Sequence, residues 1–365
     1  MPLYIYQCFA YPDVITYITV DSTVTGVGKY AYDIYNLMKP ESSIIQIIFN
    51  KKYMDNRYRN PVMGTRYPVV NYFLSGIVYR DIISDVNSVE EVVHITSQTM
   101  KPVFNSKHMV VTVHDIMASQ NNIKTGSVME AVKKRYMNQY LKAYMKYNNI
   151  VTVSNTVKSQ ILETFNIDER KVTVIPPYIP NYFYHLENKE KLREKLGLPT
   201  DKTLILSVSS NQPRKNLGMV KRVMDRLGNK YSLVRVGPAL GNSITFNNVD
   251  ETTMNEIYNA CDVLYFPTLM EGFGYPVVEA FKTGLPVVSS DIDIIREVSS
   301  DAAVLVDPTD LQDNIKGISS AIENEKTMIE RGFVISKKYT ASSIRQLLVN
   351  YYNNIIDGSV NNKTY

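Results

Sequence analysis

Short apolar runs alternate with amphipathic segments along nearly the whole chain. The runs are rich in β-branched residues and bounded by turn residues or helix caps, which is typical of buried parallel strands. They include residues 14–20, 44–48, 92–95, 110–113, 150–153, 172–175, 204–208, 233–236, 263–266, 286–289 and 304–306. Segments with helical periodicity lie between them, for example residues 28–38, 128–147, 156–165, 216–227 and 276–283. This repeated strand–helix–strand order predicts an α/β architecture of doubly wound parallel sheets.

A cluster of prolines divides the chain into two units of similar size. Pro176, Pro177 and Pro180 cannot continue a helix or a central strand, so they predict a stiff connector. We expect one unit over residues 1–180, a second over 181–340, and a long helix within 341–365. Ligands of such folds bind outside the carboxyl ends of the strands, and here we also expect binding between the units.

The composition fits a globular protein of about two domains, given the 365 residues of the chain. Hydrophobic residues make up 44% and charged residues 21%, which excludes a disordered chain, and the 16 glycines and 16 prolines are too few for a collagen-like one. The formal charge of +4 suits an anionic small molecule as ligand, but it is too weak to predict nucleic acid as a partner.

Cysteine usage and the apolar pattern predict a cytoplasmic location. Cys8 and Cys261 lie far apart and imply no disulfide framework, so a reducing compartment is the simplest interpretation. Residues 1–7 lack the basic and apolar regions of a secretory signal. No stretch approaches the roughly 18 apolar residues that a membrane-spanning helix needs.

The densest candidate site covers residues 267–280. A predicted strand ends there in a loop with Gly272-Phe273-Gly274-Tyr275, and Pro276 falls where the first helical residue is expected. A helix that starts this way offers backbone N–H groups to a phosphate or diphosphate. Two carboxylates flank the loop: Glu271 within it, and Glu279 one turn into the helix, where it could accept hydrogen bonds from sugar or ribose hydroxyls. Ordinary turn glycines and a first-turn acid are the alternative.

Two cations, Arg214 and Lys215, lie between a predicted strand and a helix that begins near Asn216. Cations at a helix N-terminus oppose the helix dipole, and a bound anion would resolve this conflict. The alternative is a solvated basic turn.

Gly26 and Gly28 follow the first strand and open a helix. The segment formally fits G-x-G-x-x-A, but the glycines come late and the second strand lacks the acid that would hold a ribose. We therefore expect a glycine-rich loop that lets the backbone approach a phosphate, or else a tight turn without a ligand.

His114 and Asp115 stand at the end of the strand at residues 110–113. This is the strand end at which ligands bind, so His114 could donate to a sugar hydroxyl with Asp115 orienting it. A structural His-Asp pair is the alternative.

Nothing in the sequence predicts a metal site. Asp291 and Asp293 form a D-x-D pattern, yet they follow a strand and precede a helix, so we interpret Asp293 as its N-cap. The four histidines show no metal-ligand spacing, and no cysteine cluster occurs.

Residues 132–147 form a predicted basic helix in which lysines and Arg135 alternate with tyrosines. The simplest interpretation is a solvated face beside an apolar stripe. The alternative is peripheral contact with an anionic membrane or acceptor.

These residues together resemble the retaining nucleotide-sugar glycosyltransferases of family 4, also called glycosyl transferases group 1. The resemblance is strongest over residues 249–308 and spans nearly the whole chain, loosely between about 51 and 90. It includes Val249-Asp250-Glu251, Glu271-Gly272-Phe273-Gly274, Pro276, Glu279-Ala280, Pro213-Arg214-Lys215-Asn216, Gly26-Val27-Gly28 and His114-Asp115. The most specific element is the E-x7-E pair of Glu271 and Glu279.

The resemblance implies a GT-B fold, which consists of two Rossmann-like domains with the active site in the cleft between them, no required cofactor and no essential metal. It also implies a C-terminal helix that packs back on the first domain. Glu271 would contact the donor sugar near the reacting centre, and Glu279 would hold the ribose. Arg214 and Lys215 would bind the diphosphate, which Gly26 and Gly28 would approach from the first domain. His114 would contact the donor sugar, and the main chain of Val249 would contact the base.

The implied function is hexosyl transfer from a nucleotide sugar to a glycan or glycoconjugate. The Glu271-Gly272-Phe273-Gly274-Tyr275-Pro276 variant looks most like mannosyltransferases that use GDP-mannose, and a UDP-hexose donor is the alternative. Two other classes stay open: a nucleotide-sugar epimerase of the same architecture, and a nucleotide-sugar binding protein without turnover.

Overall fold

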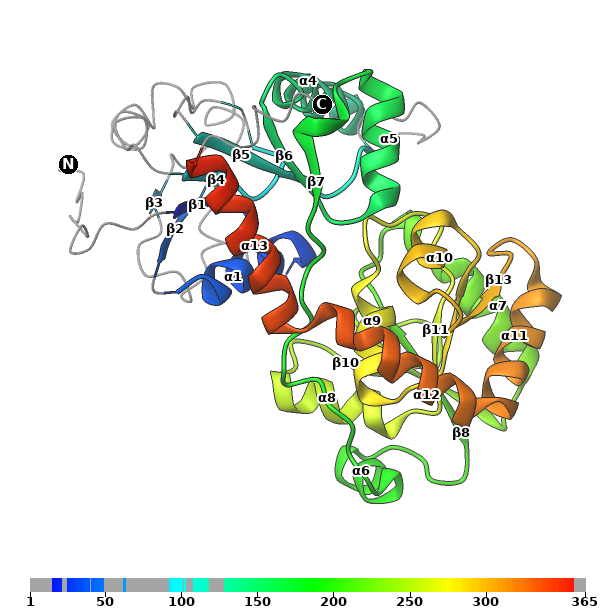
Figure 1. The fold of residues 1–365 in the computed structure, drawn as a ribbon. Coiled ribbons are helices and arrows are strands. Elements are labelled where there is room, and N and C mark those ends of the chain that lie inside the picture. Colours follow the sequence, from blue (N-terminus) through cyan, green and yellow to red (C-terminus); the bar gives the residue numbers. More distant parts are fainter. Residues whose placement is uncertain are drawn as a thin grey trace. The chain divides into compact units, whose positions relative to one another are not determined.

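The computed structural model describes residues 15–21, 25–39, 41–48, 62–63, 92–100, 102, 108–117 and 128–357. The chain forms two compact units (Figure 1). One combines Met1–Tyr178 with Ser342–Tyr365, and the other spans Ile179–Ala341. The boundary thus falls within the proline-rich connector, between Tyr178 and Ile179.

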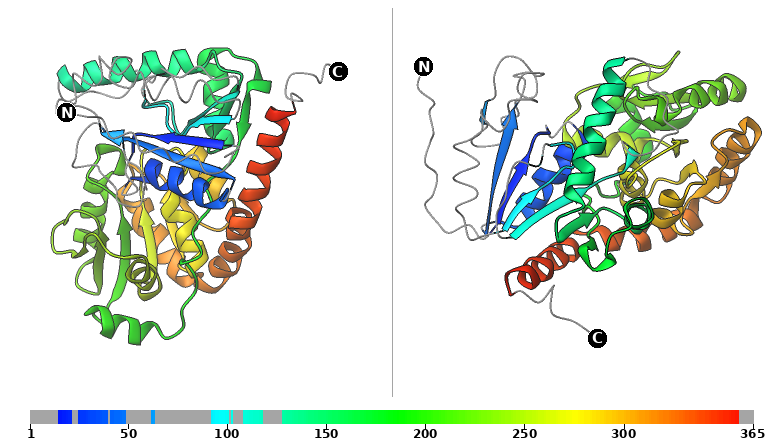
Figure 2. Two further views of the ribbon diagram at one scale, coloured as in Figure 1. Left: turned by 90° about the vertical axis from the view of Figure 1, so that its left-hand side faces the viewer. Right: turned by 90° about the horizontal axis from the view of Figure 1, so that it is seen from above.

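The first unit contains a parallel sheet in the order β3-β2-β1-β4-β5-β6-β7 within the described part of the chain. Its strands are β1 (Ile15–Thr19), β2 (Ser42–Ile48), β3 (Val62–Met63), β4 (Val92–Ile95), β5 (His108–Val113), β6 (Asn149–Thr152) and β7 (Val172–Val174). Its helices are α1 (Gly26–Leu37), α4 (Val128–Tyr144), α5 (Asn155–Phe165) and α13 (Ala341–Ile356), with a 3₁₀ turn at Glu169–Lys171. The helices α1 and α4 lie on opposite faces of this sheet (Figure 2), as right-handed crossovers require when the chain winds to either side of β1.

The second unit, all of which is described, has the sheet order β10-β9-β8-β11-β12-β13. Its strands are β8 (Thr203–Val208), β9 (Tyr231–Val236), β10 (Ile244–Phe246), β11 (Val263–Phe266), β12 (Val287–Ser290) and β13 (Val304–Val306). Its α-helices are α6 (Lys189–Leu196), α7 (Leu217–Leu227), α8 (Glu251–Ala260), α9 (Tyr275–Thr283), α10 (Asp293–Ser299), α11 (Leu311–Glu323) and α12 (Glu325–Ser336). Two 3₁₀ turns, η4 (Pro213–Lys215) and η5 (Lys337–Tyr339), complete it. All the paired strands are parallel, so the predicted doubly wound α/β architecture is confirmed.

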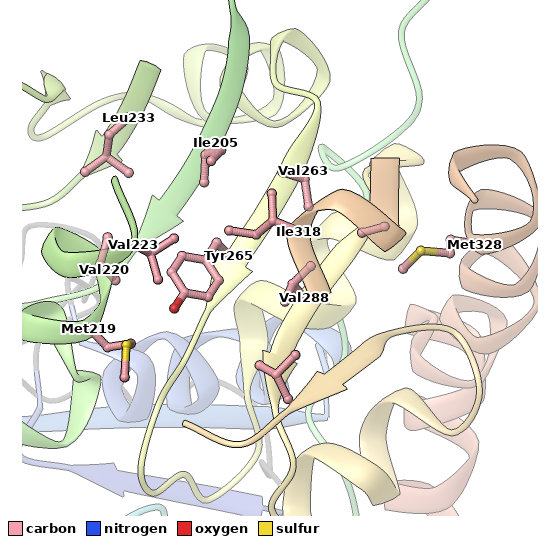
Figure 3. Packing of buried hydrophobic residues seen from close by; sticks show 12 residues of the cluster. Ile205, Met219, Val220, Val223, Leu233, Val263, Tyr265, Val288, Ile318 and Met328 are labelled. Atoms are coloured by element: carbon pink, nitrogen blue, oxygen red, sulfur yellow. The ribbon is translucent and has the colours of Figure 1, made fainter. Parts of the chain in front are cut away.

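One face of the second sheet packs against α7 and α11. Its apolar cluster joins Ile205 and Val263 on the sheet to Val220 on α7 and Ile318 on α11 (Figure 3). The helix α11 lies so close to the sheet that a Cβ atom at Gly317 would be 2.5 Å from a methyl carbon of Val306. Burial of these β-branched faces fixes the strands at the centre of the unit.

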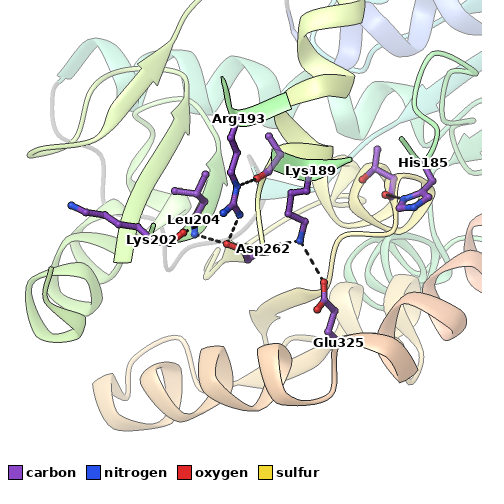
Figure 4. A network of polar contacts seen from close by, with 9 residues as sticks. His185, Lys189, Arg193, Lys202, Leu204, Asp262 and Glu325 are labelled. Atoms are coloured by element: carbon purple, nitrogen blue, oxygen red, sulfur yellow. Dashed lines mark hydrogen bonds and ion pairs between the residues drawn. The ribbon is translucent and has the colours of Figure 1, made fainter. Parts of the chain in front are cut away.

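A polar network closes the amino-terminal edge of the same sheet (Figure 4). The Asp262 carboxylate, just before β11, accepts hydrogen bonds from the Leu204 backbone N–H at 2.7 Å and from Arg193 Nη2 at 2.6 Å. Lys189 lies 3.1 Å from the other oxygen of Asp262 and 3.5 Å from Glu325. These ion pairs hold α6 and α12 against the amino edge of the sheet. Ligands of such sheets bind at the opposite, carboxyl edge.

A buried chain of hydrogen bonds holds α13 in the first unit. Tyr352 Oη donates to Tyr17 Oη at 3.0 Å and lies 2.6 Å from His94 Nδ1. His94 Nε2 lies 2.7 Å from Thr112 Oγ1, which lies 3.3 Å from Tyr30 Oη. Burial lowers the pKa of His94 to about 3, so the ring is neutral and carries one proton. The pattern is complete when Nδ1 donates to Tyr352 and Nε2 accepts from Thr112.

We expect Tyr352→Phe to lower the free energy of unfolding by about 1–3 kcal/mol, because it leaves the buried His94 N–H without its acceptor. Urea denaturation followed by far-UV circular dichroism measures the loss, since the chain has no tryptophan. Tyr184→Phe is the control, because Tyr184 is 53% exposed. Equal stabilities of the two variants would contradict this role of the hydrogen-bond chain.

Candidate functional site

The candidate site of the second unit lies where the strand order reverses. The chain continues from β8 outward to β9 and β10, and then returns to the other side of β8 with β11. The loops that follow β8 and β11 therefore leave the carboxyl edge side by side and in opposite directions. In open α/β sheets this switch point is where ligands bind.

Glu271, from the loop after β11, meets both cations from the turn after β8. Its Oε1 lies 2.5 Å from Lys215 Nζ, and its Oε2 lies 2.9 Å from Arg214 Nη1. Both cations belong to the 3₁₀ turn η4, ahead of α7, rather than to the first turn of that helix. Two cations share one carboxylate, so the cluster keeps a positive charge in excess.

Backbone contacts join the same two loops. The Leu269 N–H donates to the Arg214 carbonyl at 2.7 Å, and Arg214 Nη1 donates to the Met270 carbonyl at 3.0 Å. The hydroxyl of Thr268 is fully buried and lies 2.8 Å from Glu271 Oε1. The carboxylate is thus held by a hydroxyl as well as by two cations, and its orientation is fixed before any ligand arrives.

Burial sets the electrostatics of this cluster. The side chains of Lys215 and Glu271 are 11% and 8% exposed, whereas Arg214 is 29% exposed. Burial lowers the pKa of Lys215 below its ordinary value, and the neighbouring Glu271 acts in the opposite direction. Lys215 Nζ also lies 5.0 Å from the centre of the Phe266 ring, a cation–π distance.

The loop after β11 turns into α9 at Gly274. Gly274 has a φ of 95°, and a Cβ atom there would lie 3.0 Å from Ile295 Cδ1, so a side chain would be strained at this position. The helix begins at Tyr275, which makes Pro276 its second residue, one position later than expected. Gly272 precedes this turn and is half-buried.

Phe273 is an aromatic anchor of the loop. The residue is 5% exposed, and its ring meets Tyr275 and Tyr339 edge-on, at 5.4 and 5.3 Å between ring centres. The side chain therefore belongs to the interior of the unit and holds the loop in place.

Glu279 lies inside α9 and is buried. Its Oε2 accepts a hydrogen bond from the Tyr258 hydroxyl of α8 at 2.7 Å. Val249 is half-buried and stands just before Asp250, which caps α8 through the Thr253 N–H. Both residues are in the unit that carries the charged cluster.

The two glycines of the first unit do not form the expected loop. Gly26 is the first residue of α1 and Gly28 the third, so both belong to the first turn of the helix. The Gly28 N–H donates to the side chain of the N-cap residue Thr25 at 3.0 Å. A threonine cap satisfies this N–H locally, which is the physical reason that the helix starts earlier than the glycine pattern suggested.

His114 lies at the carboxyl end of β5, with its ring position fixed. Nε2 lies 2.8 Å from the Thr96 carbonyl, and the ring meets Tyr30 edge-on at 4.9 Å. Burial lowers the pKa of His114 to about 4, so the ring is neutral and its single proton is on Nε2. Nδ1 is then an acceptor. We expected His114 to donate a hydrogen bond to a sugar hydroxyl, but in this arrangement its Nδ1 would accept one instead.

The D-x-D acids are engaged in ion pairs. Arg296 lies 2.6 Å from Asp291 and 3.3 Å from Asp293. Asp293 is the first residue of α10 and Ile292 its N-cap, so the expected capping role of Asp293 is wrong. Over the described residues, no cluster of three or more His, Cys, Asp or Glu side chains could hold a metal ion.

The basic segment forms α4, which ends at Tyr144. Tyr140 and Tyr144 are buried, whereas Arg135, Lys142 and Lys146 are exposed. Of the helices that the structure describes, none has the length and apolarity to cross a membrane.

Of the predicted site residues, the structure brings Arg214, Lys215 and Glu271 into direct contact. Two partners were not predicted: Thr268 beside Glu271, and Tyr258 beside Glu279. Thr268 carries one sequence signal, because it follows a buried strand at the edge where ligands bind. Tyr258 is one of 27 tyrosines, and nothing in the sequence distinguishes it.

The part of the chain that matches a known family lies within the second unit. Residues 188–332 match the model of Glycosyl transferases group 1. This range includes Arg214, Lys215, Glu271 and Glu279, and thus the whole charged cluster.

Curated relatives that match the chain include two mannosyltransferases. The O-antigen chain mannosyltransferase RfbU of Salmonella typhimurium is 27% identical over 279 residues, which are 68% of this chain and 74% of that protein. The serotype-specific mannosyltransferase WbdA of Escherichia coli is 23% identical over 253 residues, or 61% of this chain. The match spans only 31% of the length of WbdA.

Solved structures share the fold at low identity. Anabaena Alr3699/HepE in complex with UDP and glucose has a TM-score of 0.76 at 14% identity, covering 93% of this chain and 100% of that one. Sucrose-phosphate synthase from Thermosynechococcus elongatus has a TM-score of 0.75 at 14% identity, covering 94% and 99%. These likenesses establish the shared fold.

We expect Glu271→Gln to lower the pKa of Lys215 further, because it removes the one carboxylate that favours the protonated amine. Titration by NMR of protein labelled with carbon-13 at lysine Cε measures this pKa, with the Lys215 signal assigned by its loss in Lys215→Arg. Glu256→Gln is the matched control, since Glu256 pairs with Lys195 instead. A Lys215 signal that titrates at the same or a higher pH in Glu271→Gln would contradict the arrangement.

Proposed function

Because this chain is a GT-B glycosyltransferase of the glycosyl transferases group 1 family, we propose that it transfers mannose from GDP-mannose to a glycan hydroxyl with retention at the anomeric carbon. The observation that carries the proposal is the cluster of Arg214, Lys215 and Glu271 at the switch point of the second sheet. The mannose donor and the glycan acceptor are supported by relatives that are named O-antigen chain and serotype-specific mannosyltransferases. A UDP-hexose is the alternative donor.

The excess positive charge of the cluster suits a leaving diphosphate. In the transfer, the bond between the anomeric carbon and the donor phosphate breaks, and a bond to the acceptor oxygen forms. Negative charge then grows on the diphosphate, and Arg214 and Lys215 would stabilise it. For retention, the acceptor attacks from the face that the diphosphate leaves, and a phosphate oxygen takes the proton of the acceptor hydroxyl.

The carboxylate of Glu271 would stabilise the positive charge of the reacting sugar. Positive charge develops on the anomeric carbon as the diphosphate departs, and a carboxylate with a fixed orientation can stabilise it. A diphosphate that binds here has to share Arg214 and Lys215 with Glu271, since both cations contact that carboxylate. In the complex, the diphosphate of the donor and the carboxylate of Glu271 would therefore both contact Arg214 and Lys215.

The other predicted contacts complete the proposal. Glu279, with one oxygen bound to Tyr258, would hold the ribose, and the main chain of Val249 would read the base. From the first unit, His114 would accept a hydrogen bond from the donor sugar, and the first turn of α1, at Gly26 and Gly28, would approach the diphosphate. The exposed cations of α4 would contact an anionic membrane surface, which cosedimentation with anionic vesicles tests.

Donor preference is the first test. Calorimetric titration with GDP, UDP, ADP, GDP-mannose and UDP-glucose in the presence of EDTA should show tightest binding of the guanine nucleotides. Transfer from GDP-mannose to glycan acceptors should also persist in EDTA, because two cations can replace a metal beside the diphosphate. Preference for UDP-glucose would correct the donor, and strict dependence on a divalent ion would contradict the metal-free mechanism. Epimerisation, or donor binding without turnover on any acceptor, would favour the two other classes.

We expect Glu271→Gln to lower the rate of mannose transfer about 10²–10³-fold, because the charge that stabilises the anomeric carbon is lost. Binding of GDP should stay at least as tight, since the variant no longer competes for Arg214 and Lys215. Rates under donor saturation and GDP titrations separate the two effects. Asp291→Asn is the control, because Asp291 pairs with the exposed Arg296 and should leave the rate unchanged. Full activity of Glu271→Gln would remove the residue from the reaction.

A further inference from the structure

A further cation, besides Arg214 and Lys215, lies at the same edge of the sheet, but it is completely buried. Arg235 is the fifth residue of β9 and has an exposed fraction of 0%. Its guanidinium donates to four neutral oxygens: Nε to the Pro238 carbonyl at 3.2 Å, Nη1 to Ser207 Oγ at 2.9 Å and Ser209 Oγ at 3.0 Å, and Nη2 to the Ser209 carbonyl at 2.9 Å. Within the fully described second unit, no carboxylate forms an ion pair with it.

A buried cation without a counter-ion is costly for the protein. The desolvation penalty of a charged group in a protein interior is several kcal/mol, and neutral hydrogen-bond acceptors offset only part of it. Burial lowers the pKa of Arg235, but a guanidinium stays protonated in proteins. The arrangement is therefore better explained if an anion from outside the chain binds close to this charge.

The backbone is built to bring Ser209 onto the guanidinium. Ser209 is the first residue after β8, and its N–H donates to the Val236 carbonyl at 3.2 Å. Gly237, the first residue after β9, has a φ of 128°. A Cβ atom there would lie 2.2 Å from the Ser209 carbonyl oxygen, so only glycine permits this approach. The carboxyl ends of β8 and β9 thus close around Arg235.

The hydrogen bonds also determine what the Ser209 hydroxyl can do. Its oxygen accepts from Arg235 Nη1, so its own proton is directed away from the guanidinium. A hydroxyl that accepts from a cation is polarised and becomes a stronger donor. Ser207, which accepts from the same nitrogen, is buried within the strand, whereas Ser209 is half-buried at its end. Ser209 is therefore the hydroxyl that can reach a ligand.

Ser209 shares its edge of the sheet with the charged cluster. The strands β9, β8 and β11 are neighbours and parallel, so their carboxyl ends leave the same edge. Ser209 follows β8 directly, and the turn with Arg214 and Lys215 comes next in the chain. The loop after β11 is bound to that turn through the Leu269 N–H and the Arg214 carbonyl.

We propose that Ser209 donates a hydrogen bond to a phosphate oxygen of the bound nucleoside diphosphate, and that Arg235 is the positioning residue behind it. Arg235 orients and polarises the hydroxyl and adds a fixed positive charge that solvent does not reach. The proposal rests on the proposed function, because it concerns the diphosphate of the same donor. It assigns to the donor site two residues that its motifs did not include.

The test measures how much each phosphate contributes to binding. Calorimetric titrations with GDP, GMP and guanosine are made on the wild type, Ser209→Ala, Ser209→Thr and Ser210→Ala, and the same series is run with UDP, UMP and uridine. Ser210 is the matched control, since it is the exposed neighbour of Ser209. We expect Ser209→Ala to weaken binding of the diphosphate about 10- to 100-fold, the range for a hydrogen bond to a charged group, and to leave the nucleoside unchanged. Ser209→Thr keeps the hydroxyl and should restore most of the affinity.

Arg235 is tested through its partner. Arg235→Lys keeps the charge but cannot bond both Ser209 and Pro238. As a single substitution it should weaken diphosphate binding, and added to Ser209→Ala it should have little further effect. Additive losses would show that Arg235 does not act through Ser209. Because the Ser209 variants leave the buried charge in place, the proposal stays testable if the Arg235 variants do not fold.

The outcomes separate this inference from the proposed function. Lys215→Ala serves as the reference for the diphosphate subsite. Loss of diphosphate affinity in Lys215→Ala with none in Ser209→Ala would overturn the inference alone. An equal loss for diphosphate and nucleoside in Ser209→Ala would also overturn it, because a merely structural role predicts that result. A wild type that binds no nucleoside diphosphate would overturn both the inference and the proposed function.

Discussion

The contact of Glu271 with Arg214 and Lys215 is the interaction on which the site of the second unit depends. It joins two loops that leave the sheet on opposite sides of its switch point, and backbone hydrogen bonds between the same loops support it. Two cations orient this carboxylate, and the cluster as a whole keeps an excess of positive charge. This arrangement suits a glycosyltransferase, because positive charge on a sugar and negative charge on a diphosphate arise together and need opposite partners.

The second sheet uses its two edges for different purposes. At the amino edge, the carboxylates of Asp262 and Glu325 pair with the two cations Arg193 and Lys189, so these charges are matched within the protein. At the carboxyl ends of β8, β9 and β11, the two cations Arg214 and Lys215 share the one carboxylate of Glu271, and Arg235 is buried with neutral acceptors only. Unmatched charge costs stability, so its concentration at these three strand ends supports the proposed anionic ligand.

The first unit depends on a different constraint, the chain of neutral hydrogen bonds through His94. This chain connects α13, which comes last in the sequence, with strands from the beginning of the unit. It also reaches Tyr30 of α1, whose ring meets His114. A neutral, fully bonded histidine can occupy the core without the penalty of a buried charge. The helix that closes the unit is therefore coupled to the residues at its carboxyl edge.

The sequence by itself determined the buried strands, several of the helices and the residue types of the site. Every strand predicted from its apolar run is present, because parallel strands buried on both faces need continuous β-branched runs. The strands at Val62–Met63 and Ile244–Phe246 were missed; both are short edge strands, and the residues of the second are only half-buried. The motif around Glu271 also predicted the family whose model matches residues 188–332.

Only the tertiary structure decided which side chains meet. The pairing of Glu271 with Lys215, the proton position on His114 and the partners of Arg235 follow from strand order and burial, which join residues far apart in the chain. Local patterns also misplaced two details: Thr25 begins α1 at the glycines, and Ile292 rather than Asp293 caps α10. The physical reason is the same in each case. A sequence pattern reports the surroundings along the chain, whereas a charge, a proton or a cap responds to neighbours that only the fold supplies.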